Sequence, residues 1–105
     1  MNVVEQAKEN TALAALEDAA KNDPEAGDVF EYRKGFNKLK NIVNGTSQDG
    51  TTINDILTPE FQRNLLKPQN KKDVAYLKSI LPTDIQKASQ DIKDLYNFLN
   101  STDPN

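Results

Sequence analysis

The sequence predicts an all-α protein, a compact bundle of four to five short helices that forms one domain over residues 1–105. Apolar residues recur at intervals of three and four positions along most of the chain, which is the period of an amphipathic helix. No segment shows the sustained two-residue alternation, rich in β-branched residues, that indicates a strand. Helix-breaking prolines at positions 24, 59, 68 and 82 divide the chain into short segments.

The first segment, residues 1–20, carries two apolar sets that cannot share one core. On a continuous helix they project to nearly opposite sides. One set comprises Val3, Val4 and Ala7, and the other comprises Leu13, Leu16 and Ala20. Two interpretations remain open. Either the helix begins near Asn10 or Thr11 after a frayed tail over residues 1–9, or one long helix packs on the bundle with its second half and offers the first set to a partner.

Residues 28–44 have the apolar spacing of a helix with one buried face. The expected buried stripe is Val29, Tyr32, Phe36, Leu39 and Val43, and the basic residues Arg33, Lys34, Lys38 and Lys40 take the other sides. The order Asp-Pro-Glu at 23–25 supplies a cap, a first-turn proline and an acid, and therefore favours a helix start. Asn-Gly at 44–45 is typical of a helix end, and the polar residues 46–51 predict the longest loop.

Three shorter helices are expected after this loop. Ile53, Ile56 and Leu57 predict the first, and Phe61, Leu65 and Leu66 predict the second, a two-turn helix over 59–67. The third runs over 71–81, with Asn70 as its cap and Asp73 as the acid of its first turn. Its apolar face comprises Val74, Leu77 and Leu81, widened by Tyr76 and Ile80.

The last segment predicts a further amphipathic helix. Thr83 is expected to cap it, and Gln86 to complete a capping box. Its expected buried stripe is Ile85, Ala88, Ile92, Leu95 and Leu99. This stripe and that of residues 28–44 are expected to form the main core.

Several classes of enzyme site lack the residues they need. The chain has no Cys and no His, so a thiolate nucleophile, Cys-ligated zinc and the commonest general base are excluded. The carboxylates fall on expected polar faces or in loops, where solvation is their expected state. Residues 45–56 match a calcium loop poorly, because Ile56 stands where the bidentate Glu is needed. The sequence therefore predicts a non-enzymatic protein without cofactor or metal.

The location of the protein in the cell cannot be inferred from its residues. The longest purely apolar stretch is residues 12–16, and the first nine residues lack the basic-then-apolar order of a signal peptide, so neither a membrane span nor a signal peptide is expected. Without Cys, the sequence gives no indication of the redox compartment. The composition, rich in Asn and Lys, is typical of small phage or low-GC bacterial proteins.

Charge is distributed unevenly along the chain, whose net charge is −3. Residues 1–31 hold eight acids against two lysines, whereas residues 32–44 hold four basic residues and no acid. Either these regions neutralise one another within the monomer or remain solvated, or they orient the protein on a charged partner.

These observations favour a protein–protein interaction module: an adaptor, an inhibitor or an assembly subunit. The expected docking face is formed by Val3, Val4 and Ala7, with Phe30 as an anchor. The positive charges that would orient the protein on its partner belong to Arg33, Lys34, Lys38 and Lys40. The expected partner is another protein or a second copy of the chain.

The alternative is a small nucleic-acid-binding protein. Segment 59–81 has the size of a helix-turn-helix, and its basic residues are Arg63, Lys67, Lys71 and Lys72. Three features oppose this interpretation: Asp73 stands beside the lysines, Pro68 occupies a turn where Gly is expected, and the whole chain is acidic.

Overall fold

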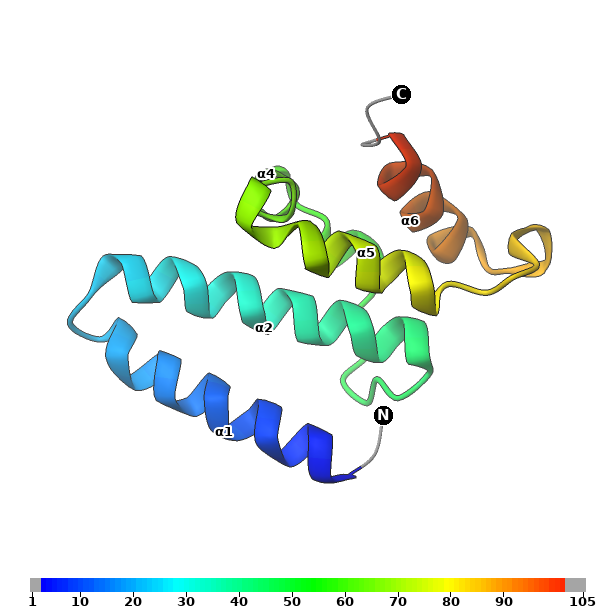
Figure 1. Ribbon diagram of the computed structural model, residues 1–105. Coiled ribbons are helices and arrows are strands. Elements are labelled where there is room, and N and C mark those ends of the chain that lie inside the picture. Colours follow the sequence, from blue (N-terminus) through cyan, green and yellow to red (C-terminus); the bar gives the residue numbers. More distant parts are fainter. Residues whose placement is uncertain (1–2, 102–105) are drawn as a thin grey trace.

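The computed structural model describes residues 3–101, apart from the side chains of Val3, Glu5 and Gln6, and this part of the chain is helical without a strand (Figure 1). The helices are α1 (Val3–Ala20), α2 (Pro24–Asn44), α3 (Ile53–Ile56), α4 (Pro59–Leu65), α5 (Lys71–Ile80) and α6 (Gln90–Ser101), with 3-10 turns η1 (Pro68–Asn70) and η2 (Ile85–Lys87). The predicted all-α bundle is confirmed.

The longest helix, α2, is the centre of the fold. Figure 1 shows α1 lying antiparallel along one side of α2, while α4, α5 and α6 lie on the opposite side. Contacts between helices agree with this view, because α2 packs against α1, α3, α4 and α5. The amino-terminal helix is therefore an outer element, held to the rest of the bundle mainly by α2.

The buried core lies on the side of α2 away from α1. Its members are Tyr32, Phe36 and Leu39 of α2, Ile53 and Ile56 of α3, Phe61 and Leu65 of α4, Leu77 of α5, and Leu95 and Leu99 of α6. Among the described side chains, α1 contributes none to this core. Each core helix presents a stripe at the 3.6-residue period, as the spacing predicts.

Local capping explains where the central helices begin and end. Asp23 accepts a hydrogen bond from the backbone N–H of Glu25, and Thr58 accepts one from that of Phe61, so α2 and α4 start at the predicted cap-Pro-acid positions. Gly45 ends α2 in the left-handed conformation with φ 75°. A capping box between Thr52 and Asp55, which the sequence analysis did not identify, starts α3.

Two expected helix caps do not form in the structure, although α5 begins at Lys71 as predicted. Asn70 makes no cap bond to α5; its side chain instead donates to the carbonyl of Asn64 across 2.7 Å, tying η1 to α4. The last helix begins at Gln90 rather than near Thr83, with the hydroxyl of Ser89 accepting from Ile92 N at 3.4 Å. Ile85 consequently lies in the separate turn η2, because Thr83 and Gln86 form no capping box.

Burial also departs from the expected pattern at Val29, Lys40 and Tyr76. Val29 is 47% exposed, because the first turns of α2 extend beyond α4 and α5 (Figure 1). Lys40 was expected on a solvated side, but only 7% of it is exposed. Tyr76, expected to widen the apolar face of α5, is 40% exposed at the edge of the core.

Candidate functional site

The outer side of α1 is an exposed apolar strip. The helix runs without a break from Val3, so the expected start near Asn10 or Thr11 is wrong and one long helix forms, while its docking to a partner stays a prediction. Its inner side, formed by Glu9, Leu13, Leu16 and Ala20, is half-buried toward α2. Its outer face, defined as Val4, Ala7, Thr11 and Ala14, is exposed at each of the four side chains.

This outer face carries no charge. Val4 is 62% exposed, and it lines a shallow hollow together with Ala7, Thr11 and the neighbouring Lys8. The hydroxyl of Thr11 donates to the carbonyl of Ala7 at 2.9 Å, which satisfies its donor within the helix. The face is therefore apolar and built from small side chains. Val3 was also expected in this set, but its side chain lies outside the described residues.

The buried Lys40 joins α1 to the rest of the bundle. Its ammonium donates to Glu9 Oε1 of α1, and it also lies 5.5 Å from the ring centroid of Phe36 and 5.8 Å from that of Tyr76. The positive charge of Lys40 is therefore paired with groups of the same chain. Lys40 was expected to orient a partner, and its burial leaves it poorly placed for that role.

Two of the other predicted basic residues also have acidic partners on the same chain. Arg33 Nη1 lies 3.1 Å from Asp73 Oδ2, and Lys38 Nζ lies 3.8 Å from Asp49 Oδ2. Lys34 instead lies 5.7 Å from the ring centroid of Phe30, the expected anchor, which is half-buried. Of these three basic residues, only Lys40 pairs with an acid from residues 1–31, as the neutralisation interpretation expects; the acids that pair with Arg33 and Lys38 lie outside that region.

A polar cluster that the sequence analysis missed connects α2 with α5. The hydroxyl of Tyr32 donates to Asp73 Oδ2 across 2.7 Å, and Arg33 reaches the same oxygen. Burial raises the pKa of Tyr32 well above its usual range, and the neighbouring Asp73 raises it further. The two helices are far apart in sequence, so no local pattern indicates this pairing.

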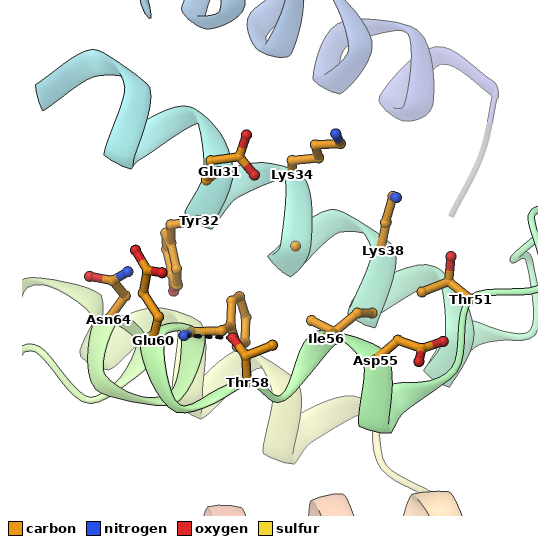
Figure 2. A pocket seen from close by; sticks show the side chains of 12 residues that line it. Glu31, Tyr32, Lys34, Lys38, Thr51, Asp55, Ile56, Thr58, Glu60 and Asn64 are labelled. Carbon is orange, nitrogen blue, oxygen red and sulfur yellow. Dashed lines mark hydrogen bonds between the residues drawn. The ribbon is translucent and has the colours of Figure 1, made fainter. Parts of the chain in front are cut away.

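A groove of about 440 Å³ separates α2 from α3 and α4 (Figure 2). Tyr32, Gly35, Ile56 and Phe61 form its apolar part. Its polar lining carries both signs of charge: Glu31, Lys34, Lys38, Asp55 and Glu60. The backbone N–H of Thr52 donates to Asp55 and holds the pKa of that carboxyl below its usual range, so Asp55 is ionised at neutral pH and unsuited to act as a general acid.

The residues of the nucleic-acid alternative lie together at the junction of α4, η1 and α5. Arg63, Lys67, Lys71 and Lys72 are all exposed. None forms an ion pair within 4.0 Å with an acid in the described part of the chain. We call these four residues the basic surface.

Comparisons with protein-family models, curated proteins and solved structures find no match to this chain. Among residues 3–101, no group of three or more His, Cys, Asp or Glu side chains is arranged to hold a metal ion. No helix in the same range has both the length and the apolar character needed to cross a bilayer. The protein's exposed surfaces are therefore the features from which a function can be proposed.

Proposed function

We propose that the protein is a non-enzymatic protein-binding module that docks through the outer face of α1 onto an apolar helix face of a partner protein. The observation that carries this proposal is the one-sided support of α1. Its inner side packs on α2, while its outer face leaves Val4 62% exposed. An 18-residue helix held on one side offers a straight surface for a second helix.

The chemistry of the outer face suits helix packing. Ala7 and Ala14 are small, so a partner backbone can approach closely and interdigitate its ridges with those of α1. Burying the exposed part of Val4 is favourable by roughly 25 cal/mol per Å² of apolar surface. The face has no charge to desolvate, because Thr11 is its only polar member and its hydroxyl is already bonded.

The double variant Val4→Glu/Ala7→Glu tests this proposal. Both side chains are exposed, so circular dichroism should show the wild-type helix content and a similar melting temperature. Proteins captured from the native host by the wild type should be lost by this variant, because its carboxylates would have to be desolvated at the interface. Val29→Glu, at an exposed valine of α2, is the matched control and should retain them.

A deletion of residues 1–9 is a poorer test, because it removes Glu9 and leaves Lys40 without its carboxylate. A shorter truncation, which deletes residues 1–8, leaves Glu9 in place and keeps this ion pair. If the double variant and the shorter truncation capture the same proteins as the wild type, docking through the outer face of α1 is disproved.

The nucleic-acid alternative has less support. The basic surface is exposed, as phosphate binding needs. The same chain, however, presents six exposed acids between residues 17 and 31 and has a net charge of −3, which is the wrong sign for a general nucleic-acid binder. Asp73 is the acid nearest to Lys71 and Lys72 in sequence, but it pairs with neither lysine. It accepts hydrogen bonds from Tyr32 and Arg33 instead.

A further inference from the structure

Within residues 3–101, several basic side chains form no ion pair with an acid. Arg33, Lys38 and Lys40 each contact a carboxylate of the same chain. The basic surface of Arg63, Lys67, Lys71 and Lys72 contacts none among the described residues, and all four side chains are exposed. This positive charge is therefore available to a second molecule.

The opposite charge is exposed on another part of the same molecule, where α1 turns into α2. This acidic hairpin end comprises Glu17, Asp18, Asp23, Glu25, Asp28 and Glu31, all exposed. Its one basic residue, Lys21, lies 3.5 Å from Asp18, with side chains 70% and 82% exposed. This lysine cancels only one of the six negative charges, so the acidic hairpin end keeps a net negative charge.

The two surfaces belong to different layers of the fold. The acidic hairpin end closes the α1–α2 pair, whereas the basic surface lies at the junction of α4 and α5, on the other side of α2 (Figure 1). No ion pair within the described residues joins them. Their charges therefore remain complementary between molecules.

From this complementarity we infer that copies of the protein associate head to tail, with the acidic hairpin end of one copy on the basic surface of the next. A second copy fits better than a nucleic acid, because each copy places its acidic hairpin end on the basic surface of one neighbour and receives the acidic hairpin end of another neighbour on its own basic surface. Such contacts are heterologous, and they continue into a filament or close into a ring. The inference does not depend on the outer face of α1.

Sedimentation velocity of the whole chain tests the inference at two salt concentrations. At about 20 mM salt the charges act over long distances, and the wild type should associate as its concentration rises. At about 300 mM salt the ions screen these exposed charges, and the protein should sediment as a monomer. A wild type that is monomeric at both salt concentrations overturns the inference.

Two charge-reversal variants locate the contact. Lys71→Glu/Lys72→Glu changes the basic surface, and Asp28→Lys/Glu31→Lys changes the acidic hairpin end. Each variant alone should associate at least about tenfold more weakly than the wild type at low salt, because one side of the contact now repels. Mixed together they should form complexes, since each retains the surface that the other lacks. Absence of complexes in the mixture contradicts the inference.

Controls separate this contact from other effects of charge. Lys87→Glu/Lys93→Glu changes the net charge as much as Lys71→Glu/Lys72→Glu but lies outside both surfaces, so it should associate as the wild type does. Equal weakening in this control would show a net-charge effect and disprove a specific contact. Circular dichroism confirms folding; glutamates at the start of α5 are favourable with the helix dipole.

Two further outcomes distinguish the competing functions. If the wild type is monomeric but binds a DNA duplex at low salt, and Lys71→Glu/Lys72→Glu abolishes that binding, the basic surface recognises nucleic acid and the inference is wrong. The outer-face variant Val4→Glu/Ala7→Glu should self-associate normally. Its loss of head-to-tail association would move the contact to α1 and likewise overturn the inference.

Discussion

The hydroxyl of Tyr32 donates a hydrogen bond to Asp73 Oδ2 across 2.7 Å and thereby ties α2 to α5. Tyr32→Phe removes this donor while keeping the ring that stacks on Phe61 at 5.4 Å. We expect a loss of roughly 1.5–3 kcal/mol in the free energy of unfolding, the range for a hydrogen bond to a charged group. Urea unfolding followed by circular dichroism measures it, and an unchanged midpoint would contradict the pairing.

The same contact predicts a decline in stability at alkaline pH. Burial, and then Asp73, raise the pKa of Tyr32 above its ordinary value of 10.0, so the folded state keeps the phenol proton more tightly than the unfolded state. The stability from this group is complete below pH 10 and decreases as the pH rises above it. Urea midpoints between about pH 9 and 11 should fall more steeply for the wild type than for Tyr32→Phe.

Deletion of core side chains should destabilise the bundle strongly. Leu39 of α2 and Leu95 of α6 are both fully buried. Leu39→Ala and Leu95→Ala should each lower the free energy of unfolding by roughly 2–5 kcal/mol, because each leaves a cavity. Asp94→Ala, at a neighbouring residue outside the core, is the control and should change it by less than about 0.5 kcal/mol. Wild-type melting of both leucine variants would be incompatible with this core.

Two glycines of α2 should respond oppositely to alanine. A Cβ at Gly35 would lie 3.0 Å from the ring of Phe61, whereas one at Gly27 would meet only Ala20 Cβ, at 3.8 Å. Alanine generally favours a helix interior by roughly 1 kcal/mol over glycine. Gly27→Ala should therefore raise the melting temperature, and Gly35→Ala should lower it by displacing Phe61. Differential scanning calorimetry compares the two; an equal increase in both would show that α2 and α4 do not pack closely at Gly35.

Single substitutions of the two residues in the Glu9–Lys40 ion pair should lower the free energy of unfolding by unequal amounts. Glu9→Gln leaves a buried ammonium without its carboxylate, whereas Lys40→Met leaves a carboxylate that is 28% exposed and keeps an apolar chain beside Phe36. Glu9→Gln should therefore cost more. A double-mutant cycle in urea should give a coupling free energy of roughly 1–3 kcal/mol. Additive effects of the two substitutions would show that the pair does not hold α1 to α2.

Local patterns correctly predicted most of the helices, but they predicted less well which side chains near the ends of an apolar stripe are buried. The spacing of Tyr32, Phe36 and Leu39 correctly predicts one buried face, since these positions return to the same side of a helix. Val29 shares that spacing but is exposed, because the stripe extends beyond the helices that cover it (Figure 1). Periodicity gives the direction of a side chain, whereas burial also needs a neighbour.

The candidate surfaces were predictable to different degrees. The opposed apolar sets of α1 correctly indicated an outward-facing Val4 and Ala7, because helical geometry alone sets their direction. The prediction that four basic residues around Phe30 form a docking surface did not anticipate their partners within the chain. Arg33 contacts Asp73, and Lys40 contacts Glu9. Those acids come from other helices, so the charge balance depends on how the helices pack.

Local sequence patterns were enough to predict the helical class, the prolines that divide the chain, several of the caps, and the two-sided character of α1. Each follows from interactions within a few residues: a cap bonds two or three positions away, and an apolar stripe repeats every 3.6 residues. Tertiary packing decides that Lys40 is buried against Glu9, that Tyr32 meets Asp73, and that no acid among residues 3–101 forms an ion pair with the basic surface. These outcomes depend on which helices lie side by side. Glu9 and Lys40 are separated by 31 positions, and Tyr32 and Asp73 by 41, so no local pattern indicates that they make contact.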